Sequence, residues 1–447
     1  MKRSSSSFAE LPSLVDEEGD EPGTILPRRI HILGLGAIGS LVAHSLRSLT
    51  DPPPVTLIFH KTEAYEEWHK SSQEIKIITN GMTVARSGFD AELQRVGYRR
   101  HGRTVSAEEF FSEIPRAQDQ LESDHPLRTH EPDDFALPDR DITDPIDYLI
   151  LTVKAIGTVS ALLSVRNRLG PRSTILFLQN GMGMLDDVDK EVFPDPVSRP
   201  QYMVGIITHG ANNPDLSKPF RVVHAGKGAI SIGLPYSREM PSSTRSSDPF
   251  NMTPASHYLL RTVCSSPILC ASPLSPIELL QTQLEKVAIN AVINPMTVLI
   301  DCRNGGLLYN YAFSRVMRLL LAEISLVIRT LPELQDLPNL VTRFSTERLE
   351  TRVVSVANRT ADNISSMLAD VRQGRRTEVD YINGYIVKRG EELGISCFMN
   401  YMIMQLVIGK QTMIDRERQD ELPFPNVSGE RAPRYPEGDE RNRRSDR

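Results

Sequence analysis

Short hydrophobic runs separated by turn residues fill the first half of the chain. The segment that begins at Arg29, RRIHILGLGAIGSLVAHSLRSL, predicts an apolar strand, a glycine turn and an amphipathic helix. VTLIF (55–59) predicts a second strand, and IKIITNGMTVARSG (75–88) predicts a hairpin that turns at Asn80–Gly81. Strands that alternate with helices in this way are typical of an α/β fold.

Five later segments of this half are also predicted to be strands. They are DYLILTVKA (147–155), STILFLQNG (173–181), MVGIITHGA (203–211), FRVVHAGKG (220–228) and AISIGLP (229–235). The first two are continuously apolar at their centres, as in strands that are covered on both faces. We expect the last two to form an antiparallel pair around Gly226–Gly228.

The second half of the chain reads as almost wholly helical, from about Ser275 through Lys410. Polar, aperiodic stretches at 100–145 and 236–258 read as insertions. The pattern predicts an α/β N-terminal domain followed by an all-α C-terminal domain. The expected segments are a disordered tail at 1–28, the α/β domain at 29–235 with its insertion at 100–145, a linker at 236–275, the helical domain at 276–411 and a disordered tail at 412–447.

Composition and charge narrow the class of protein. With 447 residues and 40% hydrophobic content the chain can bury two cores, and its net charge of −6 implies no polyanion partner. Its four cysteines lack metal-ligand spacing and are typical of reduced thiols in an intracellular protein. The chain contains no apolar run of about 18 residues, so no transmembrane helix is expected. Acidic residues from Asp16 to Glu21 disfavour a mitochondrial presequence, so we predict a cytoplasmic location, with a mitochondrial one as the alternative.

The glycine turn carries a nucleotide-binding pattern. This GxGxxG pattern is formed by Gly34, Leu35, Gly36, Ala37, Ile38 and Gly39. Between a strand and a helix, the first glycine makes the turn and the second lets a pyrophosphate approach the backbone, while the third lets helix and strand pack closely. The pattern therefore predicts a Rossmann domain that binds a dinucleotide here. The alternative is a glycine turn without a ligand.

The end of the second strand bears on the choice of cofactor. NAD sites usually place an acidic residue there, where it binds the ribose 2′-hydroxyl. This chain has His60 and Lys61 at that place. A cation attracts a 2′-phosphate, whereas a carboxylate repels it, so we predict NADP (NADPH) with Lys61 at the phosphate. In the alternative, Lys61 is only solvated and Glu63 binds the ribose.

Two further residues follow strands at the edge where ligands of open α/β sheets bind. Lys154 directly follows a buried strand, which is a poor place for a solvated side chain, so we expect it to contact the cofactor or the substrate. Asn180 follows the next strand. It is expected to meet the nicotinamide ribose or the substrate, or else to be a turn residue.

A polar stripe runs along an otherwise apolar helix at LEKVAINAVINPMTVLIDCRNGG (284–306). Lys286, Asn290 and Asn294 stand four residues apart and therefore share one face. Buried amides and ammonium groups need partners, which either a ligand or neighbouring helices must supply. Pro295 is expected to kink or break this helix, and Asn304 adds another amide in the turn that follows.

A lysine combined with a nicotinamide site indicates a specific chemistry. Hydride attack on a ketone produces an alkoxide, which needs a proton and a nearby positive charge. The ammonium group of Lys286 can supply both, and desolvation would lower its pKa toward neutrality. Asn290 and Asn294 can orient the oxygens of a substrate without adding charge.

A second group of polar residues lies in DNISSMLADVRQGRRTEVDYINGY (362–385). Asn363, Ser365 and Ser366 offer donors that suit a carboxylate. Glu378 follows an arginine-rich turn, and composition alone favours a solvated ion pair between Glu378 and one of these arginines.

These motifs resemble those of the ketopantoate reductases (2-dehydropantoate 2-reductases), NADP-dependent enzymes of pantothenate synthesis. The resemblance spans roughly residues 29–410 without the insertions. It implies a Rossmann domain, a helical C-terminal domain related to that of 6-phosphogluconate dehydrogenase, and an active cleft between the two. The matching stretches are GLGAIG, LTVKA, LQNGMG, THGA, KVAINAVINPMT with CRNGG, and SSMLADVRQGRRTEVDYINGY, of which the last two are the most specific.

The resemblance also implies roles for single residues. Lys286 resembles the general acid of the family. Glu378 resembles a cleft glutamate that contacts the cofactor and supports catalysis, which replaces the ion-pair interpretation. Ser366 resembles the serine that meets the substrate carboxylate. The implied substrate-binding amides are Asn290, Asn294 and Asn304. The implied cofactor-facing residues are the glycine turn, Lys154, Asn180, and Gly210 and Ala211 of the THGA turn.

The residues together with this resemblance predict an enzyme that reduces 2-dehydropantoate to (R)-pantoate with NADPH and a lysine general acid. We expect a small 2-oxo acid as substrate, and neither a metal, a nucleic acid nor a membrane as partner. A homodimer is left open. The alternatives are a reductase of another 2-oxo acid and a non-catalytic NADP-binding paralogue with a regulatory role.

Overall fold

The computed structural model describes residues 28–94, 98–100, 103–105, 144–215, 217–236 and 252–421. Most of the two expected insertions, the tail at 1–27 and the last part of the C-terminal tail lie outside these residues. Two compact units make up the chain. Unit 1 holds the described residues up to Asn180 and from Met184 to Gln283, and unit 2 holds Gly181–Gly183 and those from Leu284 onward.

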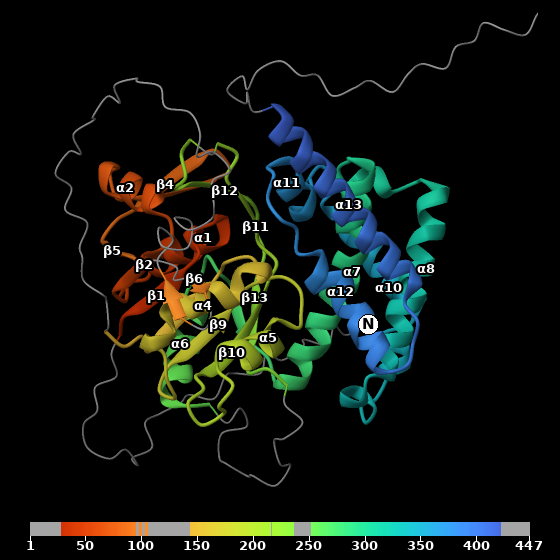
Figure 1. Cartoon of the computed structure of the whole chain (residues 1–447), viewed down its shortest axis with the longest axis horizontal. Coiled ribbons are helices and arrows are strands. Elements are labelled where there is room, and N and C mark those ends of the chain that lie inside the picture. Colours follow the sequence, from red (N-terminus) through yellow and green to blue (C-terminus); the bar gives the residue numbers. More distant parts are fainter. Residues whose placement is uncertain are drawn as a thin grey trace, which may run out of the picture. The chain divides into compact units, whose positions relative to one another are not determined.

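A mixed eight-stranded sheet forms the centre of unit 1 (Figure 1). Its strands are β1 (Ile30–Leu33), β2 (Val55–Phe59), β5 (Phe89–Leu93), β8 (Tyr148–Leu151), β9 (Thr174–Phe177), β10 (Gln201–Ile207), β13 (Ile230–Gly233) and β14 (Ala271–Pro273). Their order is β14-β13-β10-β9-β8-β1-β2-β5, and all neighbours are parallel except β10 and β13. From β5 to β10 this is the 3-2-1-4-5-6 order of a Rossmann fold, as predicted.

Both faces of this sheet are covered. The helices of unit 1 are α1 (Ala37–Leu46), α2 (Thr62–Lys70), α4 (Thr158–Val165), α5 (Met184–Glu191) and α6 (Pro254–Cys264), with 3₁₀ turns η1 (Ala155–Gly157) and η2 (Arg166–Arg168). One hydrophobic cluster joins alternate strand residues to Leu41 of α1 and Leu259 of α6. Another joins the opposite strand residues to Leu162 of α4 and Val188 of α5. Burial on both faces explains why these strands read as continuous apolar runs.

A smaller four-stranded sheet packs against α1 in unit 1. It has the order β11-β12-β3-β4 and consists of β11 (Gly210–Asn212), β12 (Arg221–Gly226), β3 (Ile75–Thr79) and β4 (Met82–Arg86). The predicted hairpin turn is confirmed, because Asn80 and Gly81 have φ angles of 51° and 79°. The other short strands, β6 (Tyr98–Arg100) and β7 (Arg103–Val105), pair with each other.

The predicted antiparallel pair around Gly226–Gly228 is wrong. β12 pairs with β11 and β3, whereas β13 pairs with β10, so the glycines connect two different sheets. The backbone passes so close to its neighbours there that a Cβ on Gly228 would overlap Thr208 and the backbone nitrogen of His209. Glycine is needed here for close approach and not for a hairpin turn.

The expected linker at 236–275 is wrong over its described part. α6 begins at Pro254, with the side chain of Thr253 accepting a hydrogen bond from the backbone N–H of Ser256. This is an ordinary start signal for a helix, with a threonine cap followed by proline. β14 then adds a parallel edge strand to β13. Residues 252–275 therefore belong to unit 1.

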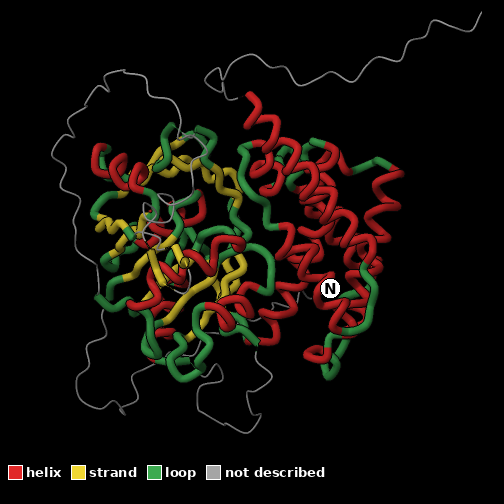
Figure 2. Tube along the Cα trace, viewed as in Figure 1, coloured by secondary structure: helices red, strands yellow, loops and turns green. Residues whose placement is uncertain are grey.

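Unit 2 is helical, as predicted, and Figure 2 shows the contrast with the strand-rich unit 1. Its elements are α7 (Pro276–Ile300, from Leu284 on), η3 (Asn304–Leu307), α8 (Tyr311–Thr330), η4 (Pro332–Leu334), α9 (Leu340–Arg343), α10 (Thr346–Arg359), α11 (Ser366–Arg372), α12 (Val379–Glu392) and α13 (Phe398–Glu421). The disorder expected from residue 412 is wrong for the first ten residues, which continue α13. Arg418 holds them by donating to the backbone oxygen of Arg372 at 2.7 Å.

The helix containing Pro295 is not broken. α7 is assigned as one helix from Pro276 to Ile300. Proline lacks the N–H that would bond to the carbonyl of Ala291, one turn earlier. The side chain of Asn383 on α12 makes that bond instead, at 2.9 Å. A tertiary hydrogen bond thus compensates for a local defect.

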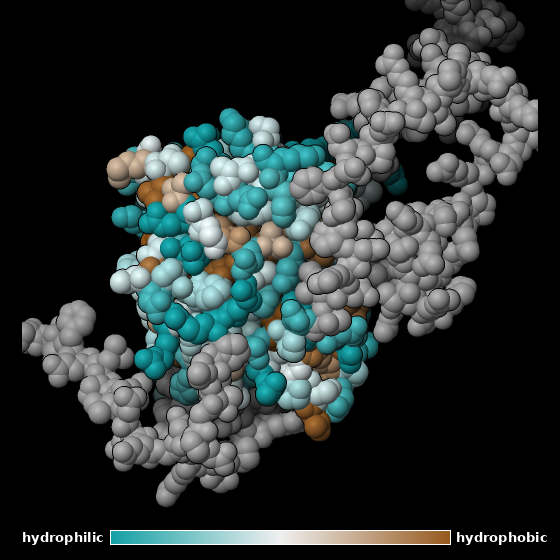
Figure 3. All heavy atoms as spheres, turned by 90° about the vertical axis from the view of Figure 1, so that its left-hand side faces the viewer, coloured by the Kyte–Doolittle hydropathy of each residue, from teal (hydrophilic) through white to brown (hydrophobic). Residues whose placement is uncertain are grey.

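Figure 3 shows one face of the described chain, whose surface is mixed in character. Hydrophilic residues predominate over the uncovered part of the face in Figure 3, with hydrophobic residues in small groups among them. Scattered apolar residues of this kind are ordinary for a protein surface. Among the described helices, none has the length and apolar character that crossing a bilayer requires.

Candidate active site

The glycine turn between β1 and α1 has the geometry of a nucleotide-binding loop. Gly34 has a φ of +106°, and a Cβ there would stand 2.5 Å from the backbone nitrogen of Val153. A Cβ on Gly39 would overlap the carbonyl oxygen of Gly34 and the hydroxyl of Thr152. A Cβ on Gly36, by contrast, would have no atom within 4 Å. The fold itself therefore requires Gly34 and Gly39. Gly36 faces open space, so a ligand can approach its backbone closely.

Thr152 supports this turn and was missed by the sequence analysis. It directly follows β8, and its hydroxyl donates to the carbonyl oxygen of Gly34, while its backbone N–H donates to Leu33 at 2.9 Å. These bonds tie the glycine turn to the neighbouring strand end. The available signal was a threonine at the end of an apolar run, within the LTVKA motif.

Three predicted residues of unit 1 follow strands that run parallel to β1. Lys61 follows β2 and is exposed at the N-cap of α2. Lys154 follows β8 and precedes η1, and Asn180 follows β9; both are half-buried. Because β1, β2, β8 and β9 are parallel, these residues and the glycine turn lie at one edge of the sheet. Ligands of Rossmann folds bind at this edge.

The THGA turn follows β10 and is held by a buried histidine. Ala211 is half-buried on β11, opposite His224 of β12. His209 contacts His224 between Nδ1 and Nε2 at 3.0 Å, and its own Nε2 lies 3.0 Å from the carbonyl oxygen of Leu269. The backbone N–H of Gly228 donates to Nδ1 of His209 at 3.1 Å. In this network Nδ1 of His209 accepts a hydrogen bond and its Nε2 faces a carbonyl acceptor.

In unit 2, α7 presents the predicted polar stripe. Lys286 and Asn290 are half-buried, and Asn294 is buried. Burial lowers the pKa of Lys286 to about 8, and the negative charge of Glu378 acts in the opposite direction. Glu378 is only 4% exposed and stands at the N-cap of α12. The structure thus brings an ammonium group and a carboxylate from two different helices into electrostatic contact within one unit.

The amides of Asn290 and Asn294 remain available to a ligand. Among the described residues, neither side chain has a hydrogen-bond partner; only the backbone oxygen of Asn294 is engaged, by the hydroxyl of Thr297 at 2.8 Å. Hydrogen bonding between helices, the alternative for this stripe, therefore finds no support at these two positions. These amides can therefore bond to water or to a polar ligand.

Asn304 is placed differently. It is buried in η3, where its amide nitrogen donates to the hydroxyl of Thr360 at 2.8 Å and its backbone N–H donates to the carbonyl of Asn363 at 2.9 Å. Its side-chain oxygen is buried without a partner among the described residues. The amide nitrogen of Asn304 therefore has a structural role. Its side-chain oxygen can accept a hydrogen bond from a ligand.

The two serines at the start of α11 differ in their contacts. Ser365 is buried and caps α11 by accepting from the backbone N–H of Leu368 at 3.0 Å, and it also bonds to Thr297 at 2.7 Å. Ser366, the predicted carboxylate ligand, is exposed at the first residue of α11. The sequence analysis offered both serines as donors and did not identify Ser365 as the cap. The signal was a serine before an apolar run, three residues ahead of the N–H that it accepts.

The arginine-rich turn before Glu378 has other acidic partners. Arg375 pairs with Asp370 at 2.9 Å, and Arg372 pairs with Asp301 at 3.0 Å. The solvated ion pair first considered for Glu378 is therefore not the arrangement found for these two arginines.

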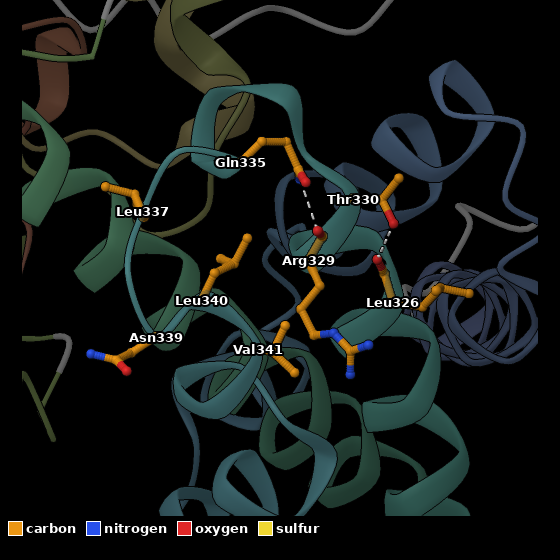
Figure 4. Close-up of a pocket in the computed structure, with 8 residues that line it drawn as sticks. All are labelled: Leu326, Arg329, Thr330, Gln335, Leu337, Asn339, Leu340 and Val341. Atoms are coloured by element: carbon orange, nitrogen blue, oxygen red, sulfur yellow. Dashed lines mark hydrogen bonds between the residues drawn. The ribbon is translucent and has the colours of Figure 1, made fainter.

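A surface pocket of about 330 Å³ lies at the C-terminal end of α8 (Figure 4). Two of its polar side chains bond to backbone oxygens in the last turns of α8. Gln335 donates to the backbone oxygen of Arg329 at 2.9 Å, and Thr330 donates to that of Leu326 at 2.8 Å. None of the predicted site residues lines it. Among the described residues no cluster of His, Cys, Asp and Glu could hold a metal ion.

Comparison with known proteins places both units in one family. Residues 30–236 match the family model described as Ketopantoate reductase PanE/ApbA, and residues 278–411 match Ketopantoate reductase PanE/ApbA C terminal. A relative from Schizosaccharomyces pombe named "Probable 2-dehydropantoate 2-reductase" is 28% identical over 381 residues, covering 84% of this chain and 95% of its own.

One further relative and one solved structure that resemble this chain carry other names. The "Ketoisovalerate reductase BEA2" of Gibberella fujikuroi is 24% identical over 419 residues, covering 85% of this chain and 83% of its own. The solved structure of D-mandelate dehydrogenase with NADH and anilino(oxo)acetate has a TM-score of 0.60 at 19% identity and covers 87% of this chain and 99% of its own. That likeness concerns the fold alone. On the matches to both family models, the chain belongs to the ketopantoate reductase family of oxidoreductases.

Proposed function

We propose that this protein reduces 2-dehydropantoate to (R)-pantoate with NADPH. A hydride from the nicotinamide forms a C–H bond at the ketone carbon, and the ammonium group of Lys286 donates a proton to the ketone oxygen. The product is a secondary alcohol, with NADP⁺ and a neutral lysine left behind. The single observation that carries this proposal is the state of Lys286, whose burial lowers its pKa to about 8 next to a buried Glu378. A general acid is most effective when its pKa lies near the working pH.

The substrate proposal rests on the amides of α7. Asn290 and Asn294 lack partners among the described residues and offer both donors and acceptors. 2-Dehydropantoate carries a hydroxyl group that 2-oxoisovalerate lacks, so it can use more of these groups. The 2-oxoisovalerate reaction is the second candidate, because relatives named ketoisovalerate reductases are 24% identical to this chain. A site built to bond a hydroxyl rejects an analogue without it by up to about 10⁴–10⁵-fold.

The cofactor proposal rests on Lys61. It stands after β2, where an acidic residue would favour NAD, and it is exposed. We propose that Lys61 meets the 2′-phosphate of NADPH, and that Gly36, Lys154, Asn180 and Ala211 contact the rest of the cofactor. Glu63, in the first turn of α2, is the competing residue if the cofactor is NADH.

Steady-state assays with two cofactors and two acids test these proposals together. NADPH and NADH are each combined with 2-dehydropantoate and with 2-oxoisovalerate, and nicotinamide oxidation is followed. We expect the highest kcat/KM for NADPH with 2-dehydropantoate. Lys61→Ala should raise the KM for NADPH by about tenfold, equivalent to about 1.4 kcal/mol, and leave NADH kinetics unchanged. A higher kcat/KM for 2-oxoisovalerate would favour the second candidate, and no turnover with either acid would reject the proposed reaction.

A further inference from the structure

The helix that carries Lys286 contains a proline, and an asparagine from another helix supplies the hydrogen bond that the proline cannot make. Pro295 has no N–H, so the carbonyl oxygen of Ala291 loses its usual donor. The amide nitrogen of Asn383 donates to this oxygen at 2.9 Å. Asn383 is 0% exposed, so bulk water does not compete for the bond.

The bond lies within the proposed substrate-binding stretch of α7. Ala291 directly follows Asn290 and precedes Asn294 by three residues. The next anchor is the backbone oxygen of Asn294, which accepts from the hydroxyl of Thr297 at 2.8 Å. The backbone oxygens of Ala291 and Asn294 are thus held in the stretch of α7 that carries the side-chain amides of Asn290 and Asn294. A misplacement of about 1 Å can reduce a reaction rate by about 10²-fold, so this anchoring matters for the chemistry.

Asn383 also connects the two groups that interact electrostatically. It belongs to α12, whose N-cap is Glu378, while Ala291 belongs to the helix of Lys286. This hydrogen bond between side chain and backbone joins α12 to α7 five residues beyond each of these charged groups. Because a charge–charge interaction depends on distance, a bond that joins the two helices bears on how strongly Glu378 acts on Lys286.

The orientation of the Asn383 amide is determined by its other contacts. Its nitrogen also donates to the side-chain oxygen of Asn400 at 3.2 Å. The nitrogen of Asn400 donates in turn to Glu323 at 2.8 Å, and Glu323 accepts the backbone N–H groups of Met399 and Asn400 at the start of α13. Turning the Asn383 amide over would set its oxygen against the oxygens of Ala291 and Asn400. The network therefore keeps the donor pointed at α7.

We propose that Asn383 is a positioning residue of the active site, which replaces the missing N–H of Pro295 and thereby holds Asn290, Asn294 and Lys286 in register with Glu378. This inference rests on the proposed reductase function. It assigns Asn383 no contact with substrate or cofactor.

A double-mutant cycle on the full-length protein tests the inference. The variants are Asn383→Leu, Pro295→Ala and the double variant, with Ser325→Ala as the control. In Pro295→Ala the backbone regains an N–H that can bond to Ala291. Ser325 is a matched control because it is buried and donates to the backbone oxygen of Phe344 at 2.6 Å, but on α8. For each protein, kcat and KM for the acid, KM for NADPH, the pH profile of kcat/KM and the free energy of unfolding in urea are measured.

Asn383→Leu should lower kcat for the acid by about 10- to 100-fold, leave the KM for NADPH within about twofold and shift the basic limb of the pH profile. In the Pro295→Ala background the same substitution should lower kcat by less than about threefold. Ser325→Ala should reduce stability without changing kcat or the pH profile. An equal loss of kcat in both backgrounds would overturn the inference, as would a loss of stability with an unchanged pH profile.

Two provisions keep the result decisive. If Asn383→Leu does not fold, Asn383→Ala takes its place in the same cycle, because it removes the donor and adds no volume. If the wild-type protein reduces neither acid, the proposed function fails by itself. The coupling between positions 295 and 383 in unfolding free energy then still tests the hydrogen bond, and its absence would reject that part as well.

Discussion

At the scale of single residues, the proposed chemistry depends on the ammonium group of Lys286, which is partly withdrawn from water. Burial, the larger effect, lowers the pKa of Lys286 to about 8, and Glu378 partly opposes it. Lys286→Ala removes the proposed proton donor, so kcat should fall by about 10²–10⁴-fold while NADPH binding stays nearly unchanged. Stopped-flow and steady-state NADPH oxidation, together with a fluorescence titration of NADPH, measure both quantities. Lys70→Ala, an exposed lysine on α2, is the control. Wild-type turnover in Lys286→Ala would rule out the catalytic assignment.

The pH dependence of the reaction has a definite sign. A general acid works in its protonated form, so kcat/KM for reduction should be high below pH 8 and fall as the pH rises through about 8. Glu378 raises the pKa of Lys286, and Glu378→Gln removes that charge. The basic limb of the profile should therefore move to lower pH in Glu378→Gln. A limb that stays in place or moves upward would show that Glu378 does not act on the titrating group.

At the scale of elements, the strand–turn–helix unit contains glycines that the fold requires and one, Gly36, that faces open space. A Cβ at Gly39 overlaps Gly34 and Thr152, whereas a Cβ at Gly36 meets nothing. Gly39→Ala should therefore force α1 away from β1 and lower the melting temperature by several degrees, which corresponds to about 1–3 kcal/mol. Gly36→Ala should leave the melting temperature unchanged and raise the KM for NADPH. Thermal unfolding and NADPH kinetics on both variants check this, and a destabilised Gly36→Ala would contradict it.

Elements also show where local pattern reading stops. The Rossmann class of unit 1, the Asn80–Gly81 hairpin and the all-helical second half were predictable, because each follows from hydrophobic periodicity, turn residues and the glycine motif. The partner of β13 was not, because two adjacent apolar strands joined by glycines suggest a hairpin equally well. The continuity of α7 through Pro295 was not predictable either, since its compensating donor, Asn383, comes from 88 residues later in the chain.

At the scale of the whole molecule, two buried histidines link stability to pH. Burial is the main cause that lowers the pKa values of His31 and His44 to about 4, and they are 4% and 3% exposed. A base whose folded pKa is depressed stays neutral in the folded state, so the unfolded state binds protons first. The associated stability is present above pH 6.5 and is lost as the pH falls toward 4, by roughly 3 kcal/mol per histidine at most.

Urea unfolding at pH 7 and pH 4.5 measures this link. The wild type should lose more unfolding free energy between the two pH values than the variant His31→Gln/His44→Gln, in which neither side chain titrates. Comparison of the two losses removes the contribution of carboxylates, which both proteins share. Equal losses would show that these histidines do not differ in pKa between the folded and unfolded states.

The sequence by itself determined the class of fold, the family and the identity of the polar residues, because hydrophobic period, turn chemistry and motif spacing are local properties. The glycine turn, the stripe at Lys286, Asn290 and Asn294, and Glu378 could all be read from the chain. Only the tertiary structure decided what each of these groups contacts. The amide nitrogen of Asn304 donates to Thr360, Ser365 caps α11, and Glu378 acts on Lys286. The burial of a side chain, its hydrogen-bond partners and its pKa depend on segments that are far apart in the sequence and are brought together by folding. A local sequence pattern therefore cannot predict them.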